Sequence, residues 1–339
     1  MKAINLKSPK TIIALAVVLL ALVAPAVIDN SYILQSLIMI VLYAYLACSW
    51  NIIGGFGGQF SLGHSVYFGI GAYISTLMFN LYQVTPWIGM LVGAVISGLL
   101  AILISYPCFK LSGSYFTLAT IAFLHVIRLL ITTQDKILGF ETRGAQGLQV
   151  KWRNGGLLDM QFQDKRDYLY VILLLLAVVL MVSYYIRHSK TGYYLAAINT
   201  NQNAAESLGV DVTRYKLKAM FISAVFTAIG GTFYAQLILF LDPQRIFGAD
   251  FSMEIMLFAV VGGAGTILGP LLGAVLLVPI NELTRSYFGA QFSGLGPLLY
   301  GLILCLVVFF LPGGLLPNMK AFYKKHRNPE HRETKKALD

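Results

Sequence analysis

Two glycine-rich segments stand out in this sequence because each interrupts a long apolar stretch. The first runs from Gly54 to His64 and the second from Gly262 to Pro270. Non-helical backbone is tolerated at membrane depth only where protein or a water-filled cavity surrounds it. A pair of interrupted segments, one in each half of a chain, is typical of a solute pathway. The residues predicted to line such a translocation pathway are Gly57, Gly58, Gln59, Ser61, Gly63, Gly262, Gly263, Gly265, Gly269 and Pro270. The alternative interpretation is a flexible turn for the first segment and a helix kink for the second.

A short polar segment between residues 188 and 215 is the second candidate site. Its pattern predicts a short helix that Asn199 caps and Gly209 ends. A capped helix that projects from an apolar protein is a suitable contact for a groove on a partner, whereas a solvated amphipathic loop is the alternative. The residues predicted to make the partner contact are Asn199, Ala204, Ala205, Glu206, Leu208 and Gly209.

The sequence carries no pattern typical of a nucleotide-binding protein, a metalloprotein or an ion-driven carrier. No Gly-x-x-x-x-Gly-Lys-Ser/Thr segment occurs, so energy for active transport must come from a partner. The three cysteines lack paired spacing and predict neither a disulfide framework nor a metal site. All fifteen acidic residues fall outside the confidently predicted helices, and Glu254 and Glu282 only flank the second interrupted segment. Because ion-driven carriers usually need ionisable groups inside the membrane, the sequence argues against one. A passive channel for a small neutral solute is a further alternative. The sequence favours a membrane-embedded enzyme less than either of these.

The composition requires a membrane environment. Of the 339 residues, 57% are hydrophobic and 12% are charged, whereas about 25% are charged in ordinary soluble domains. This balance excludes soluble enzymes, nucleic-acid binders and secreted disulfide scaffolds. Stretches of roughly 20 apolar residues, enough to cross a bilayer, lie at 11–28, 33–53, 65–82, 86–107, 114–133, 168–187, 216–240 and 296–316.

The distribution of charge predicts which segments face the cytoplasm. Residues 1–10, 187–218 and 320–339 together account for the whole net charge of +10. By the positive-inside rule, all three segments are cytoplasmic. The segment 134–167 carries nearly balanced charge, so we expect an extracytoplasmic loop with a small folded turn or hairpin.

Both basic ends lie on one side of the membrane only if residues 252–284 contribute two crossings or a re-entrant hairpin. The chain is therefore expected to double back near Gly262–Pro270. The predicted fold is an all-α integral membrane protein with about ten helical segments. Eight are full spans, two form a re-entrant or short-helix pair, and both termini are cytoplasmic. Residues 1–319 form one polytopic transmembrane domain, and residues 320–339 form a basic tail. The first span is expected to be an uncleaved anchor, with a cleaved signal peptide as the alternative.

Five motifs in a fixed order carry a resemblance to a known family. They are Gly57-Gly58-Gln59-Phe60-Ser61-Leu62-Gly63-His64, Ser114-Tyr115-Phe116-Thr117-Leu118-Ala119-Thr120, Thr142-Arg143-Gly144-Ala145-Gln146-Gly147-Leu148, Thr191-Gly192-Tyr193-Tyr194-Leu195-Ala196-Ala197-Ile198 with Asn203-Ala204-Ala205-Glu206-Ser207-Leu208-Gly209, and Gly262-Gly263-Ala264-Gly265-Thr266-Ile267-Leu268-Gly269-Pro270. Over nearly its whole length the chain resembles the branched-chain amino acid ABC importer permeases, specifically the larger of their two membrane subunits.

This resemblance implies a set of partners and a solute. The loop around Ala204–Gly209 would sit in a cleft of a cytoplasmic ATPase subunit. The complex would also hold a second homologous permease, a second ATPase and an extracytoplasmic solute-binding protein, surrounded by membrane lipid and without nucleic acid. ATP and Mg²⁺ would bind to the ATPases, and this chain would bind no cofactor directly. The solute would be leucine, isoleucine or valine, with urea, short-chain amides and sugars as alternatives. Glu206 follows Ala204-Ala205 instead of preceding such a pair, which leaves its role open.

Overall fold

A computed structural model gives the arrangement of most of the chain. The described residues are 25–26, 28–109, 114–137, 139–153, 155–288, 298–299, 301–302, 305–306, 309 and 313–319. Most of the predicted span at 11–28, about half of the one at 296–316 and the whole basic tail at 320–339 lie outside these residues.

Helices dominate the described chain, as the sequence predicts. The long helices are α2 (Ser31–Asn51), α3 (His64–Tyr82), α4 (Pro86–Cys108), α5 (Ser114–Thr133), α6 (Lys165–Arg187), α9 (Val212–Ile238), α11 (Ala249–Gly263) and α12 (Gly269–Phe288). The short ones are the π-helical turn η1 (Ile52–Phe56), the 3-10 turn η2 (Gly144–Gln146), α7 (Lys190–Thr200), α8 (Gln202–Ser207) and α10 (Pro243–Ile246). Within the described residues, five helical segments are long and apolar enough to cross a membrane: Ser31–Phe56, Pro86–Cys108, Tyr115–Thr133, Lys165–Arg187 and Val212–Ile238.

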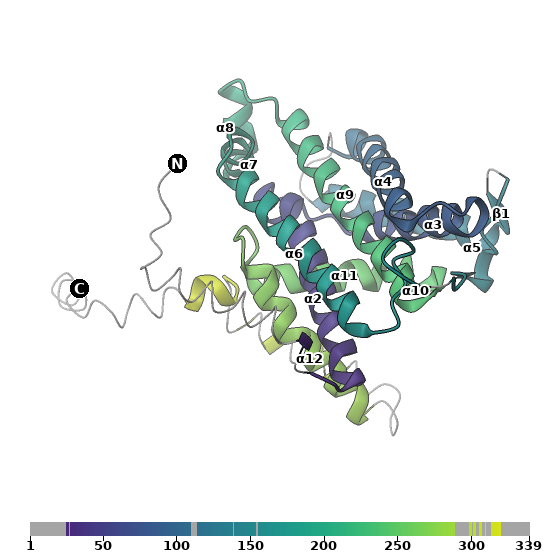
Figure 1. Ribbon diagram of the computed structural model, residues 1–339. Coiled ribbons are helices and arrows are strands. Elements are labelled where there is room, and N and C mark those ends of the chain that lie inside the picture. The colour runs from purple at the N-terminus through teal and green to yellow at the C-terminus, as the bar shows by residue number, and fades with distance from the viewer. Residues whose placement is uncertain are drawn as a thin grey trace.

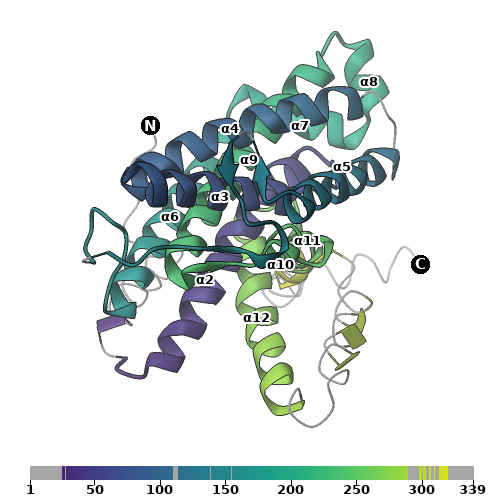
Figure 2. The ribbon, with the colours of Figure 1, turned by 90° about the vertical axis from the view of Figure 1, so that its right-hand side faces the viewer.

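The helices pack around α2 and α9 (Figures 1 and 2). Helix α9 lies against α3 and α4, whereas α2 lies against α6, α11 and α12. Glycines allow the backbones to approach closely, because a Cβ on Gly231 would meet the carbonyl of Phe68 and a Cβ on Gly71 would meet that of Ala228. Such contacts favour helix association where lipid supplies no hydrophobic drive.

A row of small residues on α4 packs against α3. A Cβ on Gly89 would lie 2.9 Å from the Cα of Ser75, and the Ser97 hydroxyl donates a 3.3 Å hydrogen bond to the carbonyl of Tyr67. The row consists of Gly89, Gly93, Ser97 and Ala101, and its four-residue spacing serves close helix packing.

The second glycine-rich segment forms the bend of a helical hairpin. Helix α11 ends at Gly263 and α12 begins at Gly269. A Cβ on Gly262 would meet the carbonyl oxygen of Gly269, and a Cβ on Gly273 would meet that of Phe258. The two helices thus run back along each other, which confirms the predicted reversal and excludes a simple kink.

The segment 134–167 is folded, as predicted. Strands β1 (Lys136–Ile137) and β2 (Phe140–Glu141) form an antiparallel hairpin. Strand β3 (Leu148–Gln149) pairs with β4 (Phe240–Leu241), which follows α9. The fully buried side chain of Gln161 accepts a 2.9 Å hydrogen bond from the amide of Arg153 and donates one of 2.8 Å to the carbonyl of Lys151. These contacts fix the loop against the ends of the long helices.

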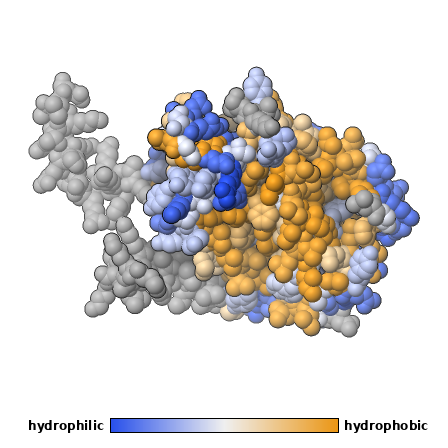
Figure 3. All heavy atoms as spheres, turned by 90° about the horizontal axis from the view of Figure 1, so that it is seen from above, coloured by the Kyte–Doolittle hydropathy of each residue, from blue (hydrophilic) through white to orange (hydrophobic). Residues whose placement is uncertain are grey.

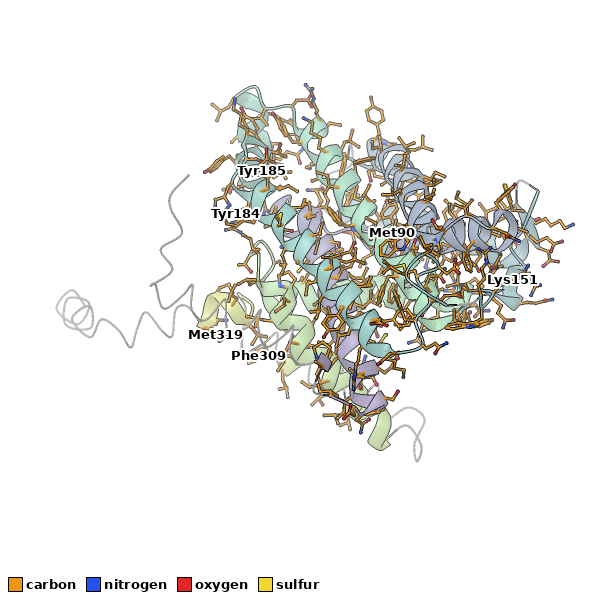
Figure 4. All side chains as sticks on the ribbon, in the orientation of Figure 1. Met90, Lys151, Tyr184, Tyr185, Phe309 and Met319 are labelled. Atoms are coloured by element: carbon orange, nitrogen blue, oxygen red, sulfur yellow. The ribbon has the colours of Figure 1, made fainter. Side chains whose placement is uncertain are left out.

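The surface has the polarity expected of a membrane-spanning protein. Figure 3 shows hydrophobic residues over the middle of one face and hydrophilic residues towards its two sides. In Figure 4, Tyr184 and Tyr185 lie near the α7 end of the bundle and Lys151 lies at the opposite end. Both tyrosines are exposed at the last turn of α6, the position where aromatic side chains meet the membrane interface.

Candidate translocation and coupling site

The two predicted glycine-rich segments lie side by side, although more than 200 residues separate them. The buried side chain of Asn51 bridges them. Its Oδ1 accepts a 2.8 Å hydrogen bond from the amide of Gly265, and its Nδ2 donates one of 2.8 Å to the carbonyl of Thr266. Gly55 permits this approach, because a Cβ there would collide with Asn51 and with the Gly265 backbone. We call the contact between η1 and the turn 263–269 the glycine junction.

Helix α7 contacts the glycine junction directly. The Nδ2 of Asn199 donates a 3.3 Å hydrogen bond to the carbonyl of Gly55. Gly58 has a φ of +66°, and a Cβ there would lie 2.7 Å from the Cγ of Asn199. Glycine at position 58 therefore satisfies both the left-handed backbone and the close contact.

The predicted capping role of Asn199 is wrong. Asn199 lies inside α7, where its backbone is helical and its side chain reaches η1. The cap of α8 is Asn201, whose extended backbone (φ −157°) lets its side chain accept a 3.1 Å hydrogen bond from the amide of Ala204. This geometry is the usual one for an asparagine N-cap.

Helix α8 presents the rest of the predicted contact residues. Ala205 is its buried residue and packs with Ile198 and Val212. Leu208 follows the last turn with 85% of its surface exposed. Gly209 has a φ of +83° and ends the helix as predicted. Ala204 and Glu206 are exposed, and the Nε2 of Gln202 donates a 3.1 Å hydrogen bond to the Glu206 carboxylate.

Arg187 adds the end of α6 to the glycine junction. Its guanidinium donates a hydrogen bond to the carbonyl of Gly265 and lies 5.7 Å from the centroid of the Phe56 ring. Sequence reasoning missed both Arg187 and Asn51. The nearest signal was the position of each residue at the end of an apolar run, beside a glycine-rich or basic segment.

The other predicted pathway residues are mostly packed within the protein. The buried Ser61 accepts a 2.7 Å hydrogen bond at its carbonyl from the indole of Trp50, and its hydroxyl accepts one of 3.4 Å from the amide of Gly63. Gly57 is buried and faces Leu195 of α7, whereas Gln59 is partly exposed. Gly262, Gly263, Gly269 and Pro270 are buried in the α11–α12 hairpin. Their part in translocation stays a prediction.

Two acidic residues expected to flank the second interrupted segment lie within helices, Glu254 in α11 and Glu282 in α12. Glu254 belongs to α11 instead of flanking a span, and the hydroxyl of Tyr43 in α2 donates a 3.3 Å hydrogen bond to its carboxylate. The overlooked signal was a charged residue every three to five positions from Asp242 to Glu254, at the start of an apolar helix.

Comparison with known proteins decides the family. A family model described as "Branched-chain amino acid transport system / permease component" matches residues 32–311. The chain belongs to this family. As a permease of this family with several apolar helices, it is a multi-pass protein of the cell membrane. The family match confirms the predicted membership.

Similar permeases carry the LivM name. The high-affinity branched-chain amino acid transport system permease protein LivM of Salmonella typhimurium is 29% identical over 297 residues, which cover 82% of this chain and 68% of that protein. LivM of Escherichia coli is 28% identical with the same coverage. A probable LivH permease of Methanocaldococcus jannaschii is 26% identical over 249 residues, covering 70% of this chain and 75% of that protein. Among solved structures, PsaBC from Streptococcus pneumoniae in complex with Fab has a TM-score of 0.45 and 13% identity, covering 91% of this chain and 99% of that chain. The matches to LivM confirm the predicted resemblance to the larger permease subunit.

Proposed function

We propose that this chain is the LivM-type permease subunit of an ATP-binding-cassette importer and carries leucine, isoleucine and valine into the cell. The names of its relatives support this solute class. The observation that supports a coupled importer is the hydrogen bond between Asn199 and Gly55. It links the segment that bears α8 to the buried glycine junction. A displacement of α8 would therefore be transmitted through this hydrogen bond to the helices of the bundle.

The partners in this proposal are a second permease, two ATPases and an extracytoplasmic binding protein. Similarity to LivH as well as LivM supports a pair of related permeases. ATP and Mg²⁺ would bind to the ATPases, and α8 would insert into a groove on one of them. Leu208 suits that contact, because an apolar side chain exposed at the tip of a polar loop gains free energy when a partner covers it.

The proposed route of coupling runs through three contacts. A shift of α8 moves α7, since Ala205 packs against Ile198. Helix α7 then moves the backbone at Gly55 through Asn199. Asn51 passes that movement to the turn between α11 and α12. Each step is a hydrogen bond or a buried contact, so ATP-driven closure of the ATPases would change the glycine junction.

The proposed topology has about ten helical segments, with α8 and both termini in the cytoplasm. In a Cys305→Ser background, we expect a membrane-impermeant maleimide added to intact cells to label Leu158→Cys and to leave Asn203→Cys unlabelled until the cells are opened. Both positions are exposed, whereas Cys48 and Cys108 are buried. Labelling of both positions from the same side would contradict the topology.

Replacing Leu208 with aspartate should abolish ATP-driven uptake. The charge would have to enter an apolar groove, so we expect at least a tenfold loss of leucine uptake and weaker co-purification of the ATPases. Leu208→Met keeps the apolar surface and serves as the control. The fold should persist in both variants, because Leu208 is exposed. Normal uptake by Leu208→Asp would contradict the assignment of α8.

The function itself is tested by reconstitution of the permease pair with its ATPases and binding protein in proteoliposomes. We expect leucine uptake that requires ATP and survives a proton uncoupler. Uptake by this chain alone, or uptake that an uncoupler abolishes, would favour a channel or an ion-coupled carrier instead.

A further inference from the structure

Four polar side chains, one from each of four helices, form a cluster that is separate from the glycine junction. They are Tyr43 of α2, Tyr234 of α9, Arg245 of α10 and Glu254 of α11. The Tyr43 hydroxyl donates to the Glu254 carboxylate at 3.3 Å. Arg245 lies close enough to both tyrosines and to Glu254 to interact electrostatically with each of them. A cation and a carboxylate therefore share one site with two phenols.

Aromatic rings form the wall behind these groups. The Phe251 ring lies 6.0 Å from that of Tyr43 and 4.7 Å from that of Phe68 between centroids. Phe68 also lies 5.5 Å from Tyr234, and Phe258 meets the edge of Tyr43 at 5.2 Å. Phe68 and Phe258 are buried. The buried Phe68 and Phe258 rings thus pack behind the partly exposed rings of Tyr43, Tyr234 and Phe251.

This cluster opens toward the side of the molecule that carries the folded loop. Arg245 is exposed, whereas Tyr43, Tyr234 and Glu254 are partly buried. Arg245 follows β4, which pairs with β3 of the loop, and α10 contacts both η2 and α5. In the proposed topology this is the extracytoplasmic side, from which a solute would arrive.

The charge of Arg245 is maintained in this setting. Partial burial alone would lower the pKa of Arg245, but the neighbouring phenol oxygens and the Glu254 carboxylate outweigh it and raise that pKa.

We propose that the cluster binds a zwitterionic α-amino acid with an apolar side chain on its way through the permease. Arg245 binds the carboxylate, Glu254 binds the ammonium group, and the partly exposed rings of Tyr43, Tyr234 and Phe251 contact the side chain. A guanidinium matches a carboxylate in a bidentate geometry, and a separate carboxylate matches the ammonium group. This inference rests on the proposed function, because it names the solute contacts of that importer.

The first test compares uptake by three variants of the complete complex in proteoliposomes. We expect Arg245→Gln and Glu254→Gln each to lower the maximal rate of leucine uptake at least tenfold, with assembly and ATP hydrolysis maintained. The double variant Arg245→Glu/Glu254→Arg restores opposite charges but reverses the ends of the site. It should assemble normally and still fail to transport, whereas a merely structural ion pair would be rescued by the exchange.

The second test measures binding to the permease without the binding protein. In the Cys305→Ser background, Gln244→Cys places an exposed thiol beside Arg245. Millimolar leucine should slow its labelling by maleimide severalfold. Leucinamide, which lacks the carboxylate, and 4-methylpentanoate, which lacks the ammonium group, should not slow it.

Normal uptake by both single variants, or equal protection by leucine and its two analogues, would overturn the inference while leaving the importer intact. Failure of the unsubstituted complex to take up leucine with ATP would instead overturn the proposed function. The two failures are therefore distinguishable.

Discussion

Replacing Gly262 with alanine is expected to destabilise this permease strongly. The added Cβ would meet the carbonyl oxygen of Gly269 and lie 2.8 Å from the amide nitrogen of Gly273. Both are backbone atoms of α12, so no side-chain rotation relieves the contact and the two helices must separate. Overpacking of this kind costs about 1–3 kcal/mol, and separation of α11 from α12 also disturbs the glycine junction.

The measurement is thermal stability in detergent, followed by fluorescence size-exclusion chromatography. We expect the midpoint of Gly262→Ala to fall by several degrees and the yield of assembled complex to fall with it. Gly63→Ala is the matched control, because an added Cβ there would lie at least 3.5 Å from its nearest neighbours. Equal midpoints for the two variants would show that α11 and α12 are not closely packed at Gly262.

Replacing Asn51 with alanine should separate ATP hydrolysis from transport. The change leaves the amide of Gly265 and the carbonyl of Thr266 without the partner that now bridges them to α2. An unpaired buried polar group costs about 1–3 kcal/mol, so the turn should detach from η1. We expect at least a tenfold loss of leucine uptake while the ATPases continue to hydrolyse ATP.

Two further variants show whether this loss is specific to the bridge. Asn51→Asp keeps an acceptor for the Gly265 amide, but it buries a carboxylate and places an oxygen against the Thr266 carbonyl. Because an unpaired buried charge is costly, its uptake should fall at least as far as that of Asn51→Ala. Asn30→Ala removes the cap at the other end of α2, where the side chain accepts a 2.9 Å hydrogen bond from Tyr32. It should cost about 1 kcal/mol of stability and leave coupling unchanged. Wild-type uptake by Asn51→Ala would contradict the proposed route.

The long helices of this protein were predictable because hydrophobicity in a membrane protein is nearly continuous along each span. The ends of these helices were less predictable, because capping residues lie outside the apolar run. The predicted stretch 216–240 overlaps a helix that begins at Val212 and ends at Ile238. It begins earlier because Asp211 caps it by accepting a 3.0 Å hydrogen bond from the amide of Arg214. The reversal at 263–269 followed from charge parity, although hydropathy alone gave one interrupted stretch.

The candidate site was predicted in its parts but not in its connections. The glycine-rich turns and α8 have local signatures, whereas the side chains that join them do not. Asn51 and Gly265 are 214 residues apart, and no pattern in the sequence predicts that two such residues are in contact. The same holds for Arg245 and Glu254, whose proximity to Tyr43 depends on how α2 packs against α11.

The attachment of α8 has a consequence for the modular evolution of such importers. Ala205 is its buried residue, and Gln202 is partly buried and accepts a hydrogen bond from the buried Lys216 of α9, whereas Asn203, Ala204, Glu206 and Ser207 are exposed. In the proposed importer, substitutions on that outward face would change which ATPase the permease recruits without altering the membrane core. Exchanging the exposed residues 203, 204 and 206–208 between permeases should therefore exchange the ATPases that they recruit in the proposed importer, while each permease keeps its own solute.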